Sequence, residues 1–402
     1  MIIFFYMSFK LCAYYLYTLL VSNSFLKRGI QMQKVIIIFI LLVMLCGCWD
    51  ARPMKDVQLG ILAAYDIVHG RYKNSILIPN IQKSGSGPTQ PSPAFIYSAN
   101  GNTPSEARKN LDNKLRNTYG PSQLDVVLFS EKLAKQNIYP YLDAFYRDPR
   151  MHLDAVLGLV RGDAAKLIST APKSEVEKSE YVEGILESLV NTTELEEVNV
   201  DTINKYIYES GIDFVTPILK KTEKNDEVSY EGMAIFSDNK YSGVDIPPRL
   251  CTLSLLMRGI KGDRALITAK IRDNESQNPK NYTTIFVEKL KASMKVPPNG
   301  KNIHVYFNTK LIVDIEEYPA DDFTLDDIPK VKKELEESLT HQAEEIFELT
   351  KEANGDIFGV GRTLHAFHND IWKQLNWKED FRKVQMHADI EVKVRTRGIY
   401  KK

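Results

Sequence analysis

The sequence predicts an α+β protein of several domains, in which the C-terminal domain is an antiparallel sheet with a long packed helix. Three observations support this class. Strand-like and helix-like segments alternate up to about residue 170. Residues 303–315 and 384–395 carry apolar side chains at every second position, which is typical of strands with one buried face. Between them, residues 330–353 carry apolar side chains every three or four positions, which indicates one amphipathic helix.

The composition excludes several classes of protein. With 44% hydrophobic and 26% charged residues, the chain is neither largely disordered nor a polytopic membrane protein. The whole chain has 52 basic and 52 acidic residues, but residues 1–47 hold four of the basic ones and no acidic one. The remainder therefore carries 48 basic and 52 acidic residues, a net charge of −4. A protein that coats nucleic acid needs a basic excess, so no nucleic-acid partner is expected.

Residues 32–48 have the pattern of an export signal. Met-Gln-Lys at residues 32–34 is followed by eleven apolar residues without a charge, residues 35–45. A basic start, an apolar stretch of ~7–15 residues and a small residue before the cut describe a secretory signal. The stretch is shorter than the ~20 apolar residues that span a bilayer comfortably. Its end, Leu45-x-Gly47-Cys48, resembles the lipobox of bacterial lipoproteins.

The lipobox resemblance implies a signal peptide at residues 32–47 that is removed before Cys48. Leu45 and Gly47 would then be the residues that the signal peptidase recognises, and Cys48 would carry a diacylglyceryl group and a fatty acyl chain. Each buried CH₂ contributes ~0.8 kcal/mol, so two or more chains hold a protein firmly on a bilayer. The alternative is an uncleaved signal anchor in which the Gly-Cys pair occurs by chance.

A second hydrophobic stretch, residues 1–31, precedes this signal. Because Met32 opens a complete signal by itself, we expect translation to begin there and residues 1–31 to be a gene-model extension. The alternative is a genuine extra membrane segment, interrupted by Lys10. After processing, Cys251 would be the one thiol without lipid, so no internal disulfide is expected. Its apolar neighbours favour a buried, inert thiol over a nucleophile.

Residues 48–220 are expected to form a mixed α/β region with possibly two subdomains. Thr103, Pro104 and Glu106 occupy the cap, first-turn and capping-box positions of a helix. Glycine, serine and proline make residues 83–93 a loop. Strands are expected over residues 57–65, 75–79, 124–129 and 153–160, and helices over residues 103–119, from residue 130, and over residues 163–168, 181–191 and 200–210.

A charged linker, residues 221–229, is expected to separate this region from a C-terminal domain of residues 230–402. A strand over residues 230–236 and a turn at residues 237–239 open that domain. The stripe on the long helix is expected to pack on the sheet. Coiled-coil pairing with a partner is the alternative, because the stripe continues for just over three heptads.

No motif carries a defined catalytic chemistry, so we expect no enzyme activity, no catalytic residue, no metal site and no bound cofactor. Gly359-Val360-Gly361 lacks the third glycine of a dinucleotide loop and the lysine of a phosphate loop. His365 and His368 have a spacing that can bind metal, but no further ligand pattern supports it.

Two further groups of side chains favour structural roles. The tryptophans at residues 372 and 377, with Phe381, are expected in the core, and an exposed anchor for a partner protein is the alternative. Arg147 and Arg150 flank an Asp-Pro turn, where pairing with carboxylates is expected and contact with a partner surface is the alternative.

Four segments together resemble the Ger(x)C family, the C-subunit lipoproteins of bacterial spore nutrient-germinant receptors. The start Cys-Trp-Asp at residues 48–50 is distinctive, and the order of the other three segments is similar to the family's. The sequence differs at Asn137, where the family often has glycine. The other segments are residues 130–151 with the strand and helix that follow, residues 231–244, and residues 356–381 with the last strand.

This resemblance implies a fold of three mixed α/β domains and a non-enzymatic subunit that is needed for nutrient-triggered germination. It also implies a lipid anchor in the spore inner membrane, with the folded body on the outer face. The implied partners are membrane lipid and two membrane subunits, one polytopic and transporter-like and one with a large soluble region. The alternative function is a solute-binding lipoprotein of a transporter, which needs two similar lobes that the sequence does not show.

Overall fold

The structure is a computed structural model, and the account below concerns residues 57–402, which form one compact unit. Residues 1–31, the expected signal apart from residue 39, Cys48 and the loop expected at residues 83–93 lie outside the described residues. Among the described residues, no helix combines the length and the apolar character needed to cross a bilayer. The structure describes residue 39 and residues 57–79, 94–170, 178–223, 227–271, 281–297, 302–318 and 325–396.

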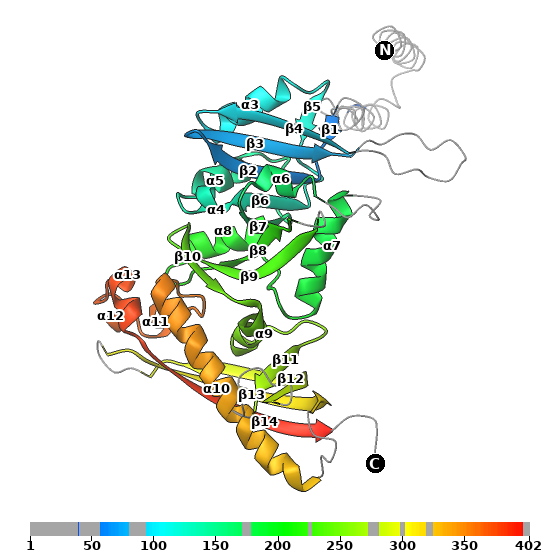
Figure 1. The fold of residues 1–402 in the computed structure, drawn as a ribbon. Coiled ribbons are helices and arrows are strands. Elements are labelled where there is room, and N and C mark those ends of the chain that lie inside the picture. The colour runs from blue at the N-terminus through cyan, green and yellow to red at the C-terminus, as the bar shows by residue number, and fades with distance from the viewer. Residues whose placement is uncertain are drawn as a thin grey trace, which may run out of the picture. The chain divides into compact units, whose positions relative to one another are not determined.

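An eight-stranded sheet organises the first half of this unit (Figure 1). Its central strands β2, β6, β7 and β8 run parallel, and antiparallel strands flank them on both sides. A small parallel pair, β1 (Val57–Leu59) and β5 (Thr118–Gly120), lies apart from it. The strands, in their order across the sheet, are β10 (Lys240–Ile246), β9 (Val228–Ser237), β8 (Val215–Lys221), β7 (Val156–Arg161), β6 (Val126–Ser130), β2 (Leu62–Val68), β3 (Arg71–Ile78) and β4 (Phe95–Gly101).

Helices cover both faces of this sheet. Successive side chains along a strand point to opposite faces, and each face has its own hydrophobic core. On β2, Leu62 and Ala64 belong to one core, while Ala63 and Tyr65 belong to the other. The first core includes side chains of α6 (Ala164–Leu167) and α7 (Lys178–Asn191). The second includes side chains of α3 (Pro104–Asp112), α4 (Glu131–Ala134), α5 (Tyr139–Arg147) and α8 (Val200–Tyr208).

A four-stranded sheet organises the second half, in the order β11 (Leu266–Lys270), β12 (Tyr282–Lys295), β13 (His304–Glu317) and β14 (Gln385–Thr396). Helix α10 (Ile328–Ala353) packs along it. Helix α9 (Pro248–Met257) contacts β9 of the large sheet as well as β11, β12 and β13. Its residues from Leu250 to Met257 are all buried, as expected for a helix between two sheets.

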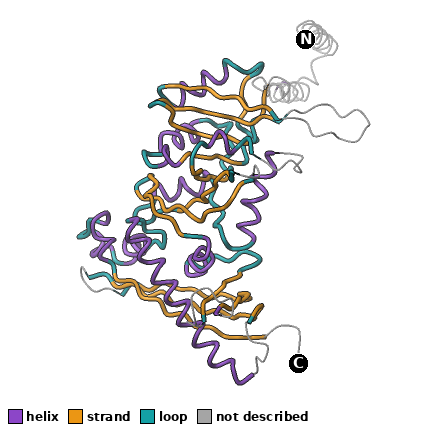
Figure 2. The backbone as a smooth tube through the Cα atoms, in the orientation of Figure 1, coloured by secondary structure: helices purple, strands orange, loops and turns teal. Residues whose placement is uncertain are grey.

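The remaining helices lie between β13 and β14 along the chain, and Figure 2 shows the helical segments of this stretch beside the C-terminal strands. The first of them precedes α10, and the others follow it and lead the chain back to the sheet at β14. They are η3 (Leu325–Asp327), α11 (Val360–Phe367), α12 (Asn369–Trp372), α13 (Trp377–Asp380) and η4 (Phe381–Lys383).

The predicted α+β class is confirmed. The two sequence patterns that predicted it, alternation in the strands and the apolar stripe of the helix, are confirmed as well. Every second residue of β13 from Val305 to Ile315 is buried, and all of these side chains are apolar except that of Thr309. The stripe of α10 faces the protein's own core, so its predicted packing on the sheet is confirmed and coiled-coil pairing is not needed to cover it. The predicted turn at residues 237–239 is confirmed, with positive φ angles of 52° at Asp238 and 63° at Asn239.

Three details of the prediction are wrong. The C-terminal sheet is mixed, since β13 and β14 pair in parallel. The helix α10 lies between them in the chain and returns it to the end of the sheet where β13 began, as a crossover connection does. The helix expected to reach residue 119 ends at Asp112, whose carboxylate accepts a hydrogen bond from Tyr119 N at 3.1 Å. The strand expected over residues 57–65 is divided at Gly60 into β1 and β2.

The segment expected as a linker, residues 221–229, connects β8 to β9, which are antiparallel neighbours in the large sheet. Thr222 N donates to Glu227 O at 2.9 Å across this connection. Strands on both sides of the expected linker therefore share one sheet.

Leu339 tests the packing of α10 on the sheet. It is fully buried in the middle of the stripe, so Leu339→Ala leaves a cavity and is expected to lower the free energy of unfolding by about 2–5 kcal/mol. The control Lys333→Ala changes a side chain of the same helix that is 77% exposed and is expected to stay within about 0.5 kcal/mol of wild type. Urea unfolding of both variants measures the difference, and equal stabilities would contradict the packing.

Candidate functional site

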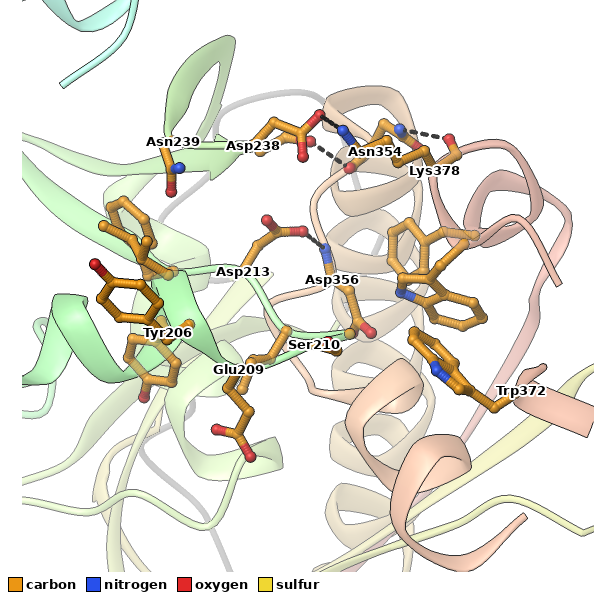
Figure 3. Close-up of a pocket in the computed structure, with 18 residues that line it drawn as sticks. Tyr206, Glu209, Ser210, Asp213, Asp238, Asn239, Asn354, Asp356, Trp372 and Lys378 are labelled. Atoms are coloured by element: carbon orange, nitrogen blue, oxygen red, sulfur yellow. Dashed lines mark hydrogen bonds and ion pairs between the residues drawn. The ribbon is translucent and has the colours of Figure 1, made fainter. Parts of the chain in front are cut away.

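A partly open cavity of about 320 Å³ lies where the end of α8, the β9–β10 turn and the C-terminal helices meet (Figure 3). The first wall is the segment from Tyr206 to Phe214, which joins α8 to β8. The opposite wall comes from Asn354 and Asp356, just after α10, and from the aromatic residues of α12, α13 and η4. The cavity therefore lies between segments that are more than 100 residues apart in the sequence.

Two aspartates join these walls by reciprocal hydrogen bonds, and we call this pair the aspartate interlock. Asp213 N donates to Asp356 O at 2.9 Å, and Asp356 N donates to the Oδ2 atom of Asp213 at 2.8 Å. A third bond runs beside them, because Ser237 Oγ donates to Asn354 O at 2.8 Å. Asn354 ends α10 in the left-handed conformation, with φ of 52°, and this directs the chain toward Asp213.

The carboxylate of Asp356 also caps α11. Its Oδ1 and Oδ2 atoms accept from Val360 N at 3.0 Å and from Gly361 N at 2.7 Å. These are free amide groups at the start of the helix, which attract negative charge. The amides of the Gly359-Val360-Gly361 segment thus donate hydrogen bonds to the protein's own aspartate. This contact accounts for the two glycines without a bound nucleotide.

Burial sets the protonation of the interlock. Burial raises the pKa of Asp356 to about 7, although hydrogen bonds from the Gly361 and Val360 amides oppose this increase. Burial likewise raises the pKa of Asp213 to about 6, and the backbone amides of Asp356 and Asp238 oppose it. The negative charge of Asp213 raises the pKa of Asp356 further, and that of Asp238 raises the pKa of Asp213, because like charges repel in a poorly solvated site.

Two glycines allow the chain to cross at this point. Arg362 N donates to Gly211 O at 2.7 Å. A Cβ atom at Gly211 would lie 2.4 Å from the carbonyl carbon of Gly361, and the φ angle of Gly211 is +76°. Both observations exclude a larger residue there. A Cβ atom at Gly361 would lie 2.6 Å from the indole of Trp377.

The aromatic side chains form the far wall of the cavity. The ring of Trp377 lies 5.6 Å from that of Trp372 and 5.5 Å from that of Phe381. Phe381 is buried and both tryptophans pack against the core, so the core interpretation is confirmed. Lys378 closes one side through an ion pair with Asp238 at 2.6 Å. The cavity therefore combines an aromatic wall with carboxylates that already have partners.

The structure separates the other residues that the sequence singled out. Leu45, Gly47 and Cys48 lie outside the described residues. His365 is exposed, and its ring lies 5.5 Å from that of Trp372 and is tilted against it by 43°. Among the described residues, no group of three or more histidine, cysteine or acidic side chains is placed to hold a metal.

The remaining two predictions concern Cys251 and the arginines near residue 148. Cys251 is fully buried, burial raises the pKa of its thiol to about 12, and Tyr230 Oη donates to it at 3.3 Å. The inert-thiol prediction is therefore confirmed. Arg150 pairs with Asp148 at 2.9 Å and Arg147 with Asp143 at 2.8 Å, which confirms structural pairing.

Sequence reasoning missed the aspartate interlock. A signal for half of it existed in the sequence, because Asp356 precedes a short helix that begins between two glycines, Gly359 and Gly361. The other half, Asp213, stands 143 positions away in an ordinary turn between α8 and β8. No local pattern links the two, so only the folded chain reveals the pair.

The interlock predicts a dependence of stability on pH. The ordinary pKa of both groups is 3.8, and burial raises it to about 6 and about 7 in the folded protein. The folded state therefore binds protons more tightly than the unfolded state between about pH 4 and pH 7, and this contribution to stability is lost as the pH rises. Asp213→Asn cannot titrate, so the free energy of unfolding of wild type is expected to fall relative to that of Asp213→Asn across this range.

Chemical unfolding of both proteins at pH 4.5, 5.5 and 6.5 (roughly the range given by linkage) measures this difference. Asp370→Asn, which replaces an exposed carboxylate, is the control and is expected to follow wild type. A difference between wild type and Asp213→Asn that does not change with pH would contradict the assigned protonation.

Two models of known protein families match this chain. A family model described as the spore germination protein N-terminal domain matches residues 50–221. A second model, described as spore germination B3/GerAC-like, C-terminal, matches residues 231–398. The two matches follow each other and together cover most of the chain.

Relatives and a solved structure agree with these models. The spore germination protein GerQC of Bacillus cereus is 25% identical over 376 residues, which cover 92% of this chain and 99% of the relative. Spore germination protein B3 of Bacillus subtilis is 24% identical, over 90% of this chain and 97% of the relative. The crystal structure of the GerBC protein has the same fold, with a TM-score of 0.55 at 17% identity over 83% of this chain and 96% of that one. The chain is therefore a member of the Ger(x)C family of spore germination proteins.

Proposed function

We propose that the protein is a membrane-anchored lipoprotein subunit of a spore germinant receptor and acts by assembly and signalling, without catalysis. The observation that carries this proposal is the ordered match of both family models, over residues 50–221 and 231–398. Full-length relatives named as spore germination proteins support the same role. The polytopic and the large soluble membrane subunits of one receptor are the proposed partners.

The anchor is part of this proposal. The lipobox ends at Cys48, and the first family match begins at residue 50. The sequence matched by the family model would thus start directly after the lipidated residue, and the body would lie on the outer face of the spore inner membrane. Leu45 and Gly47 would be read by the signal peptidase, and the acyl chains on Cys48 would hold the body at the bilayer.

The described part of the fold supports a mechanical role. One hydrophobic core runs from β2 of the large sheet through α9 to β13 and α10. The aspartate interlock ties the same two halves together by hydrogen bonds, and both of its carboxylates accept hydrogen bonds from backbone amides of the protein itself. Such a body can pass a displacement from one membrane partner to another, because a packed core moves as a unit.

A germination assay with anchor variants tests the proposal. We expect spores with Cys48→Ala to lose their response to one class of nutrient, as deletion spores do, since the body leaves the membrane. Loss of light scattering after addition of single nutrients is the measurement. The control Cys251→Ala removes the buried thiol and is expected to keep both the response and the membrane location.

Two results would contradict the proposal. Deletion spores that germinate normally on every nutrient, together with absence of the protein from dormant spores, would remove the receptor role. Normal germination of Cys48→Ala spores, with the variant still in the membrane fraction, would remove the lipid anchor.

A further inference from the structure

Two large apolar side chains are exposed at the start of β4, the edge strand of the large sheet. Phe95 is 48% exposed and Ile96 is 38% exposed. Of the exposed large apolar side chains among the described residues, these are the one pair that is adjacent in the sequence. Edge strands usually carry charged side chains that keep other molecules away. An apolar pair at this position therefore indicates that a partner surface covers it.

The edge of β4 does not favour a partner strand as the occupant. Lys114 Nζ donates to Ser98 O at 2.6 Å, and Asn110 Nδ2 donates to Asn100 O at 2.8 Å. A strand that paired with this edge would have to compete for both carbonyls, since main-chain hydrogen bonds supply the affinity of strand addition. The two apolar side chains also point to opposite faces of the strand. A broad apolar surface that meets the start of β4 can contact both.

The chain itself keeps such a surface nearby, and this step rests on the lipid anchor of the proposed function. Val57, the first residue of β1, follows Cys48 by nine positions. Nine residues span at most about 30 Å when the chain is fully extended. The bilayer that holds the acyl chains therefore lies within about 30 Å of β1.

The exposed pair lies at the same end of the body as β1 (Figure 1). Just after β1, Ile61 N donates to Leu77 O of β3 at 3.0 Å. Leu77 is in turn the register partner of Ile96 in β4. Neighbouring strands are about 4.8 Å apart, so Ile96 lies about 10 Å from the point where the chain enters the large sheet. The anchor thus keeps this end of the body, with its exposed pair, near the bilayer.

Charge distinguishes the two sides of this end. Lys114 and Arg116, between α3 and β5, are exposed, and the nearby carboxylate of Asp112 accepts a hydrogen bond from a backbone amide. On the other side, α7 and the starts of β6 and β7 enclose a cavity that five carboxylates line. They are Asp125, Asp154, Glu183, Glu187 and Glu197. Anionic lipid attracts the basic side, which carries the apolar pair, and repels the acidic side.

We propose that the body rests on an anionic lipid bilayer through Phe95, Ile96, Lys114 and Arg116, which we call the β4 surface. The apolar pair enters the headgroup region, and the two cations lie against lipid phosphates. The ammonium group of Lys114 has three donors and uses one of them on Ser98 O. Two apolar side chains bury too little area for firm attachment alone. The lipid on Cys48 therefore supplies the attachment, and the β4 surface determines which side of the body faces the membrane.

Spin labelling of the mature lipoprotein tests this orientation, in vesicles of phosphatidylglycerol and phosphatidylcholine in equal parts. Phe95→Cys provides the label site, and Phe367→Cys, at the 78% exposed end of α11, is the control. Cys251 is fully buried and does not compete for the label. We expect the label at position 95 to lose accessibility to a water-soluble nickel reagent and to gain accessibility to oxygen, which concentrates in the bilayer. The label at position 367 is expected to stay accessible to nickel.

A charge variant tests the basic part of the β4 surface. A basic side chain near anionic lipid contributes enough to change the ratio of docked to undocked protein about fivefold. Arg116→Gln, added to Phe95→Cys, is expected to lower this ratio by that factor, and to lose its effect in vesicles of phosphatidylcholine alone. The matched control Lys240→Gln removes an exposed cation at the opposite edge strand β10 and is expected to change nothing.

Mass spectrometry of the N-terminal peptide from the same sample separates this inference from the anchor. With lipid on Cys48, equal nickel accessibility at positions 95 and 367 would overturn the proposed orientation and leave the anchor intact. A peptide without lipid would remove the anchor and this inference together. Equal effects of Arg116→Gln and Lys240→Gln would overturn the role of charge in the β4 surface.

Discussion

The reciprocal hydrogen bonds between Asp213 and Asp356 determine how the two halves of the described fold are joined. They form only if the chain can cross itself where Gly211 and Gly361 touch. Burial of two carboxylates at this point is costly unless each accepts hydrogen bonds. The backbone amides of α11 donate to Asp356, and the backbone amide of Asp356 donates to Asp213. The same crossing fixes the start of α11 and hence the cavity wall formed by the tryptophans.

Hydrophobic packing reinforces this junction and extends it. Helix α9 is buried along nearly its whole length because it fills the space between β9 and the four-stranded sheet. Helix α10 then carries the apolar stripe from the far end of that sheet to Asn354, next to the interlock. Core packing thus supplies most of the stabilisation, while the polar contacts select one arrangement of the two halves.

Much of this fold follows from local patterns in the sequence, and the exceptions share one physical cause. Alternating side chains identified β13, and the apolar stripe identified α10. The parallel pairing of β13 with β14, the division of the first strand at Gly60 and the partnership of Asp213 with Asp356 all depend on contacts between distant segments.

Equilibrium unfolding of Gly211→Ala in the full chain, with Gly184→Ala as the control, tests the crossing most directly. Gly184 lies in α7 with no neighbour within 4 Å of an added Cβ atom, so alanine there is expected to leave stability unchanged or raise it by up to ~1 kcal/mol. Gly211→Ala is expected to lower the free energy of unfolding by more than about 2 kcal/mol and to separate the transitions of the two halves. A Gly211→Ala protein as stable and as cooperative as the control would contradict the account.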